Sequence, residues 1–209
     1  MNLENIEQSI VIVADRHNPS ILHPSFLEKE KIIEEGLHLA EPPLTTPDIS
    51  IAAFVNGLRI TVDNARLQIT NNRSFENKLD LAKVASSYLN VLPHVDYKSV
   101  GSNVFIFIEN SDAQNYLIEN FIKSGPWNSE SNKMDSAGLR FVYSQDGAVI
   151  NLSYDAGNMI SANGQERNGI LIRGNYHKEI QSVNDALSAI NNFSKNIDYL
   201  ISIIDSTFK

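Results

Sequence analysis

The chain has 209 residues, of which 42% are hydrophobic and 20% are charged, the balance of a folded globular protein rather than a disordered one. Its formal net charge of -8 argues against a general basic footprint for nucleic acid or anionic membrane. It contains no cysteine, which excludes disulfides, thiolate catalysis and cysteine-based zinc sites.

The N-terminal segment predicts a buried strand followed by a short helix. Residues 9–14 form a short apolar run, which the Asn-Pro-Ser sequence at 18–20 ends. Residues 24–35 begin with a proline and carry apolar residues among charges, which predicts a helix with Gly36 at its C-cap. The prolines of residues 41–47 then favour an extended connector.

Residues 49–70 alternate apolar and polar side chains around two turns, which predicts a three-stranded antiparallel meander. Asn56-Gly57 is a strong hairpin signal, and as a two-residue loop it places Ala53 opposite Ile60. A second two-residue turn at residues 63–64 places Ile60 opposite Leu67. The face opposite the apolar one then carries Arg59, Thr61, Arg66 and Gln68.

The middle of the chain alternates helix and strand. Residues 75–92 show helical spacing that Pro93 ends, and residues 100–108 predict a strand whose apolar run at 104–108 suits burial on both sides or contact with a partner. Ser111 is the expected N-cap of a helix that continues to about residue 124.

A second hairpin is predicted around the turn Asp146-Gly147, with Phe141 opposite Leu152 and Tyr143 opposite Ile150. The Asn- and Gly-rich residues 155–168 predict a long loop, the most mobile internal segment of the chain. Residues 170–176 are the expected last strand.

Residues 182–208 predict one long helix of about 40 Å with an apolar stripe that either pairs with a partner helix or packs on its own sheet. We therefore expect an α+β protein, with antiparallel meanders in two loosely similar halves, helices packed on one face and a long C-terminal helix. The expected organisation is a single domain over 1–209, made of two closely joined lobes at about 1–110 and 111–209.

The densest polar cluster after a strand is Asp15, Arg16 and His17, with His23 nearby. A histidine beside a carboxylate could serve acid–base or metal chemistry, so a metal-dependent hydrolase or nuclease is one hypothesis. The favoured interpretation is structural: Asp15 and Asn18 cap the turn, and His17 is exposed or packed. The sequence predicts no catalytic residues, no metal site and no cofactor.

The outward face of the first meander is the leading candidate for recognition, because Phe54 is expected there beside Arg59, with Arg66 on the adjacent strand. Arginine and aromatic residues are enriched at protein interfaces, and they also occur on platforms for single-stranded nucleic acid. A merely solvated face is the third interpretation. Further interface candidates come from the two-sided strand and the terminal stripe: Phe105, Phe107, Ile197, Ile201 and Ile204.

Three segments carry a resemblance: residues 57–69, residues 99–103 after Pro93, and a strand followed by a long terminal helix. Together they resemble a family of uncharacterised, sporadically distributed bacterial proteins. Its members have a strand hairpin, a helix, a strand with a valine-glycine and asparagine motif, and a terminal helix. The arginine that often precedes the family's asparagine is replaced here by Ser102. The resemblance implies a fold and a setting in mobile elements or defence islands, and no catalytic residues.

The leading functional hypothesis is a non-enzymatic bacterial accessory or adaptor subunit, which acts through protein–protein interaction in an assembly such as an antiviral defence or mobile-element system. Its expected partner is another protein subunit or a second copy of the chain. The alternatives are the hydrolase or nuclease that uses Asp15, His17 and His23, and a nucleic-acid-binding protein that uses Arg59 and Arg66. The net charge makes nucleic acid the less favoured direct partner.

Overall fold

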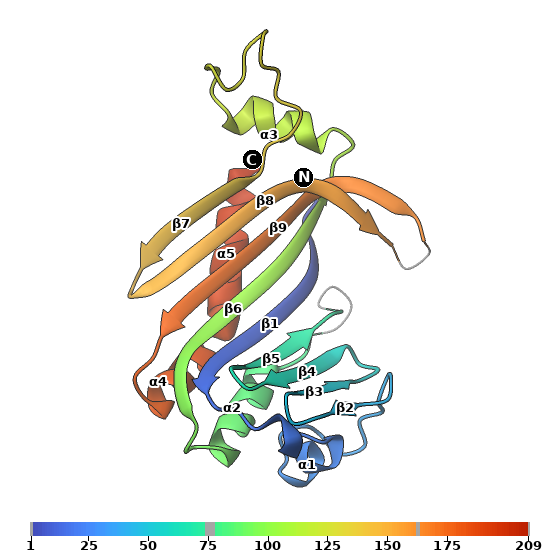
Figure 1. The fold of residues 1–209 in the computed structure, drawn as a ribbon, viewed down its shortest axis with the longest axis vertical. Helices are drawn as coiled ribbons and strands as arrows, with labels where there is room; N and C mark the ends of the chain where they lie inside the picture. The colour runs from blue at the N-terminus through green and yellow to red at the C-terminus, as the bar shows by residue number, and fades with distance from the viewer. Residues whose placement is uncertain (1, 74–77, 162–163, 209) are drawn as a thin grey trace.

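The computed structural model describes residues 2–73, 78–161 and 164–208. Its strands form one antiparallel sheet of nine, in the order β2-β3-β4-β5-β1-β6-β9-β8-β7 (Figure 1). The strands are β1 (Glu4–Asp15), β2 (Leu44–Thr45), β3 (Ile49–Ala53), β4 (Leu58–Asp63), β5 (Arg66–Asn71), β6 (Asp96–Glu109), β7 (Leu139–Gln145), β8 (Ala148–Ile160) and β9 (Glu166–Glu179). The helices are η1 (Pro19–Ile21), α1 (Pro24–Lys29), α2 (Leu81–Val91), α3 (Ala113–Phe121), α4 (Val183–Asn191) and α5 (Phe193–Thr207).

The sheet is built from two similar halves that meet at its centre. The order strand, helix, three-strand meander and helix runs from β1 to α2, and it runs again from β6 to α4. In the sheet, β3-β4-β5-β1 on one side mirrors β7-β8-β9-β6 on the other, and the first strands of both halves pair with each other. Helix α2 packs against α4 across the same centre. The prediction of an α+β fold with two loosely similar halves is confirmed, and the strand order places β6 at the start of the second half.

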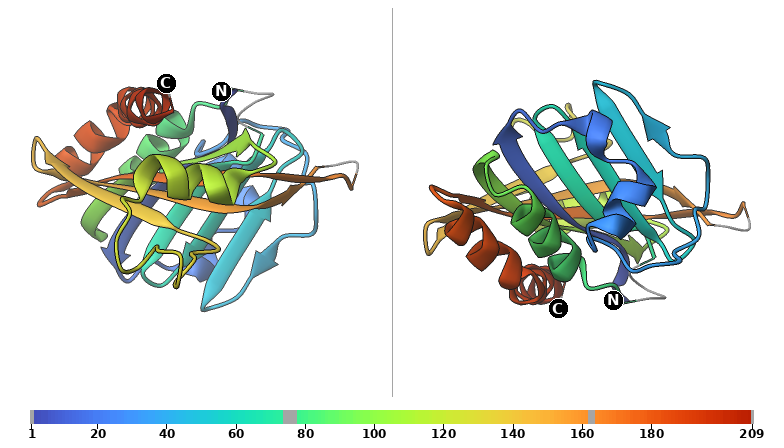
Figure 2. Two further views of the ribbon diagram at one scale, coloured as in Figure 1. Left: turned by 90° about the horizontal axis from the view of Figure 1, so that it is seen from above. Right: turned by 90° about the horizontal axis from the view of Figure 1, so that it is seen from below.

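One face of the sheet forms the core and the other is open. Helices α2, α4 and α5 lie together behind the sheet, and nothing covers the middle of its front in the view of Figure 1 (Figures 1 and 2). The covered face is apolar in every long strand, with Ile12 on β1, Ile106 on β6 and Leu152 on β8 all fully or almost fully buried. Because side chains alternate along a strand, the residues between these positions define the open face.

The C-terminal segment is two helices rather than one. Helix α4 ends at Asn191 and α5 begins at Phe193, and the Asn192 side-chain amide donates to the carbonyl of Ser188 at 2.8 Å. The expected single helix of about 40 Å over residues 182–208 is therefore wrong. Asparagine competes for backbone hydrogen bonds and weakens a helix interior, which favours a break at this position. The stripe packs on its own sheet, with α5 lying against β6 and β9.

The first hairpin has a longer loop than its sequence predicts. The Phe54 N–H donates to the Leu58 carbonyl at 2.8 Å, and Gly57 has φ +93°, so three residues, 55–57, connect the strands. A three-residue loop of this kind uses a glycine at its last position, and therefore contains the same Asn-Gly signal. The resulting register places Ala52 opposite Ile60 and Ala53 opposite Arg59, one residue away from the expected pairing.

A one-residue slip exchanges the two faces of a strand. Ser50 and Ala52 on β3 therefore point into the core, and the Ser50 hydroxyl donates to the Leu22 carbonyl at 2.7 Å. Phe54 is also buried, with 3% of its surface exposed, which contradicts its expected place on the outward face. The second turn of the meander is shifted by two residues, so Ile60 faces Ile69 and the apolar face is kept.

The second hairpin matches its prediction. Asp146 and Gly147 both have positive φ, as a two-residue turn of this type requires, and Phe141 lies opposite Leu152. The following segment does not match: β8 and β9 continue as paired strands to Ile160 and Glu166, so most of the expected loop at residues 155–168 is strand. Residues 162 and 163 lie outside the described part of the chain. Tertiary pairing here overrides the loop-like composition.

The remaining helices are shorter than expected. Helix α1 ends at Lys29 rather than near residue 35, although Gly36 does adopt a positive φ. Helix α2 begins at Leu81 after the N-cap Asp80, and the predicted start at Phe75 lies outside the described residues. Helix α3 takes Asp112 rather than Ser111 as its N-cap.

Candidate functional site

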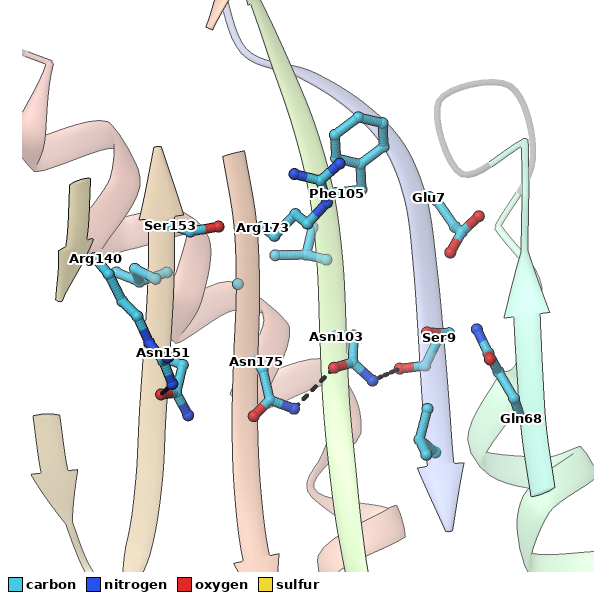
Figure 3. A pocket seen from close by; sticks show the side chains of 14 residues that line it. Glu7, Ser9, Gln68, Asn103, Phe105, Arg140, Asn151, Ser153, Arg173 and Asn175 are labelled. Carbon is cyan, nitrogen blue, oxygen red and sulfur yellow. Dashed lines mark hydrogen bonds between the residues drawn. The ribbon is translucent and has the colours of Figure 1, made fainter. Parts of the chain in front are cut away.

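The open face of the sheet holds a polar hollow that we call the trough. It has a volume of about 610 Å³ and crosses the middle of the sheet from β5 to β7 (Figure 3). Its polar and aromatic lining residues are Glu7, Ser9, Gln68, Asn103, Phe105, Arg140, Asn151, Ser153, Arg173 and Asn175. All six strands from β5 to β7 contribute, so the strand order of the complete sheet creates the trough.

A row of three asparagines forms the middle of the trough. Asn103 on β6, Asn175 on β9 and Asn151 on β8 are direct neighbours in the strand register. The Asn175 amide donates to the Asn103 side-chain carbonyl at 2.8 Å, and the Asn103 amide donates to the Ser9 carbonyl at 3.4 Å (Figure 3). These bonds fix the orientation of the Asn103 amide and leave a row of polar groups that is partly exposed.

A second row lies beside the amides and carries the positive charge of the trough. Arg173 is opposite Phe105 on one side and Ser153 on the other, and Ser153 is opposite Arg140. The Arg173 guanidinium lies 5.3 Å from the centre of the Phe105 ring, a cation–π contact. The Arg140 guanidinium donates to the Asn151 side-chain carbonyl at 3.0 Å. Arg173 also lies 3.8 Å from the Asp155 carboxylate, a long and exposed ion pair. Both arginines remain exposed, so each can still meet a further anionic group.

Glu7 supplies an acidic group on the opposite wall, next to Gln68 (Figure 3). Partial burial raises the pKa of its carboxyl above the usual value, and the charge of Arg59 opposes this shift in part. The trough therefore places carboxyl, amide, hydroxyl and guanidinium groups in one hollow. Such a set of donors and acceptors suits recognition of a polar surface that carries acidic groups.

The residues of the hydrolase hypothesis serve structural roles in the fold. His17 is 2% exposed, and its Nδ1 lies 3.0 Å from the Tyr88 hydroxyl while its Nε2 lies 3.3 Å from the Ile12 carbonyl. These partners suit a neutral ring that accepts from Tyr88 and donates to Ile12, and burial lowers its pKa. Of the two structural alternatives for His17, exposed or packed, the structure shows the packed one.

Asp15 and His23 take part in other contacts. The Asp15 carboxylate lies 3.2 Å from the Lys98 amine, and the His23 ring caps α1 by accepting from the Ser25 N–H. Within residues 2–73, 78–161 and 164–208, no three His, Asp or Glu side chains form a group that could hold a metal ion. The structure therefore does not bring Asp15, His17 and His23 together as a metal site.

The other sequence-predicted interface residues divide into buried and accessible ones. Phe54, Phe107, Ile197 and Ile204 are all buried in the fold, so their side chains cannot meet a partner in this state. Ile201 is partly buried on α5, and Phe105 lies in the trough.

Arg59 and Arg66 do lie on the same open face as the trough. Each pairs with a nearby acid, Arg59 with Glu41 at 3.5 Å and Arg66 with Asp63 at 3.1 Å. Arg59 lies opposite Thr70, so the two arginines are further apart along β5 than the expected register places them.

Sequence reasoning placed Arg140, Asn151 and Ser153 on the reverse face of the second hairpin but did not identify a site there. It named Asn103 only as part of the motif at residues 99–103 and did not identify Arg173 or Asn175. A signal was present in the polar residues that alternate with the apolar run of β6 and with the apolar residues of β9. Only the strand pairing shows that these positions are adjacent.

No protein-family model and no curated protein matches this sequence. In the described part of the chain, none of the helices has the length and apolar character needed to cross a bilayer.

Proposed function

We propose that this protein is a non-enzymatic adaptor that binds a partner protein in the trough. The observation that carries the proposal is the open polar face itself, with the asparagine row and two exposed arginines on four adjacent strands. The hollow gives this face a recessed polar surface of about 610 Å³ that a segment of a partner can enter. The hydrogen bonds from Asn175 to Asn103 and from Asn103 to the Ser9 carbonyl also hold part of this face in one arrangement before a partner binds.

The chemistry of the trough defines the partner. Six strands spaced about 4.8 Å apart give the trough a width of roughly 24 Å, which is the length of about seven extended residues. Arg140 and Arg173 sit at the β7–β9 end, where they favour acidic side chains, and Glu7 sits at the other end. We therefore propose a polar segment of a partner protein with acidic groups at the end that meets β7.

The cellular setting is part of the same proposal. We propose that the protein works in the bacterial cytoplasm as a subunit of an assembly, which includes the possibility raised by the sequence resemblance, a defence or mobile-element system.

The test is a co-purification from the native host with two double variants. Arg140→Glu/Arg173→Glu reverses the charge of the trough, and Lys29→Glu/Lys123→Glu makes the same change at exposed positions outside it. We expect the trough variant to retain about tenfold less partner, equivalent to about 1.4 kcal/mol, and the control to retain it as the unmodified protein does. Equal retention by both variants, with both folded, would overturn the proposal.

Salt dependence separates a protein partner from nucleic acid. Nucleic-acid binding weakens steeply between low and moderate salt because binding releases counterions. The affinity of a protein partner that contacts two arginines falls less over the same range of salt. A steep loss, together with nucleic acid in the co-purified material, would favour the nucleic-acid alternative.

A further inference from the structure

The two edges of the sheet are finished differently. At one edge, β2 has only two residues, Leu44 and Thr45, and prolines precede and follow it at positions 42, 43 and 47. Short edge strands and prolines are devices that prevent another strand from adding to a sheet. At the other edge, β7 has seven residues, Leu139–Gln145, with no proline and a single charged side chain.

Strand β7 has the properties of an edge that pairs. Among the described residues, its only strand partner is β8. Val142 is 58% exposed and Tyr143 is 41% exposed, so the edge presents apolar and aromatic surface together with unpaired backbone. The consecutive residues Phe141, Val142 and Tyr143, with low charge around them, are typical of strands that associate.

The hairpin geometry shows which backbone groups are free. Gln145 and Ala148 flank the two-residue turn and exchange hydrogen bonds with each other, and antiparallel pairs alternate from there. Tyr143, Phe141 and Leu139 therefore direct their N–H and C=O groups toward β8. Arg140, Val142 and Ser144 direct their N–H and C=O groups away from the sheet, where these groups can form hydrogen bonds with a further strand.

We propose that β7 pairs antiparallel with β7 of a second copy of this chain, about a two-fold axis at Val142. The free groups at Arg140, Val142 and Ser144 are symmetric about Val142, as such a pairing requires. In this register Val142 meets the partner's Val142, Phe141 meets the partner's Tyr143, and Arg140 meets the partner's Ser144. Apolar residues thus meet apolar or aromatic ones, and no like charges are opposed.

A second copy fits better than another chain for two reasons. The sequence of β7 is complementary to itself in the register that its free backbone groups allow. The pairing also uses the outermost long strand of each copy, because the two-residue β2 ends the sheet on the other side. The assembly therefore closes at two chains instead of growing into a fibre.

The dimer would also lengthen the trough. Arg140 lies on the trough face of β7, and Val142 is on the same face, two residues along the strand. The two-fold axis joins this face to the same face of the partner. The trough of each copy then continues across the joined edge, and four arginines, Arg140 and Arg173 of each chain, lie along one surface.

The absence of native cysteine makes a direct test possible. Two residues that face each other as a hydrogen-bonded antiparallel pair have Cα atoms about 5.5 Å apart, which lies within the range of a disulfide. Val142→Cys should therefore form a covalent dimer under mild oxidation. Val149→Cys is the matched control, because Val149 is an exposed valine on β8. Its counterpart across the dimer lies three strand spacings away, roughly 14 Å, and about four residues further along the strands, which is too far for a disulfide.

The unmodified protein should sediment with twice the 23.3 kDa mass of a single chain at micromolar concentrations. Val142→Lys should shift it to a single chain, because two like charges then face each other, and Val149→Lys should leave the dimer intact. A single-chain mass for the unmodified protein up to high micromolar concentration would overturn the proposal. A dimer that Val142→Cys fails to crosslink would overturn it equally. These measurements follow self-association alone, so their outcome does not depend on the adaptor proposal.

Discussion

The two halves of the sheet share one strand order and are put to different uses. In the first half, the meander strands β3, β4 and β5 have 5, 6 and 6 residues. In the second half, β7, β8 and β9 have 7, 13 and 14 residues. The added length extends β8 and β9 past the end of β7, to Ile160 and Glu166. The trough lies where β7, β8, β9 and β6 all pair, and there the second half supplies Arg140, Asn151, Arg173 and Asn175.

The comparison shows that one topology can end in a protected edge in one copy and in an open edge in the other. The first half ends in a protected edge and holds His17 and Tyr88 in its interior. The second half ends in an open edge and supplies both arginines of the trough, to which the first half adds Glu7, Ser9 and Gln68. The same pairing rules build both halves, so the differences lie in strand length and in the residues that face solvent.

The largest effect is expected where the long strands of the second half approach most closely. A Cβ atom at Gly169 would overlap the Ile108 carbonyl and the Phe107 ring, both of which are fixed in the sheet. We expect Gly169→Ala to lower the free energy of unfolding by about 3 kcal/mol or more, measured by urea denaturation.

Gly157→Ala is the matched control for this change, since Gly157 lies directly opposite Gly169 on β8. Its added Cβ would meet the Leu171 side chain, which can move. A smaller loss is expected there. Equal losses of unfolding free energy at Gly157 and Gly169 would show that the close approach of the β6 backbone does not constrain position 169.

A smaller loss is expected from His17→Ala in the first half. The change removes two buried hydrogen bonds and leaves a cavity beside Tyr88, so unfolding should become easier by about 2–3 kcal/mol. His23→Ala, which removes only the exposed cap of α1, should cost under about 1 kcal/mol. If His17→Ala kept its stability and lost its biological activity, the enzyme hypothesis would gain support.

The smallest predicted effect concerns Glu7 and depends on pH. Burial raises the pKa of Glu7 in the folded protein above its usual value of 4.5, so the ionised form is less favourable in the fold than in the unfolded chain. Stability is therefore lost as pH rises from about 4.5 through the folded pKa. Glu7→Gln should raise the thermal midpoint at pH 7 by roughly 1–3 °C, and the gain should disappear below pH 4.5.

Glu119→Gln on the exposed surface of α3 provides the control, with no comparable gain expected. A lower midpoint for Glu7→Gln at pH 7 would show that the Glu7 charge is favourable where it sits. A gain that persists in acid would show that the amide stabilises the fold independently of that charge.

The fold class could be predicted from the sequence because alternation and turn residues are local signals. Asp146-Gly147 gave the correct register because its loop has two residues. Asn56-Gly57 gave a register that was wrong by one, because the same dipeptide also ends a three-residue loop. No local feature of residues 56–57 distinguishes the two loops, and the buried Phe54 shows which of them forms.

The candidate site could not be predicted in the same way. Asn103, Asn151 and Asn175 lie on three strands that are distant in the sequence, and their adjacency follows from the position of β6 beside β9. The arginines of the first meander were easier to see because their strands are consecutive. A polar face made by strand order leaves no periodic signal within any one strand beyond ordinary alternation.

The pairing of β1 with β6 has a consequence for synthesis of the chain. Ser9 on β1 leaves the ribosome first, and its neighbour Asn103 follows 94 residues later. At 5–20 residues per second this interval is roughly 5–20 seconds, during which the first half can fold with one side of β1 unpaired. Strand β1, whose free side later pairs with β6, is therefore the segment of the nascent chain most exposed to chaperones and to aggregation.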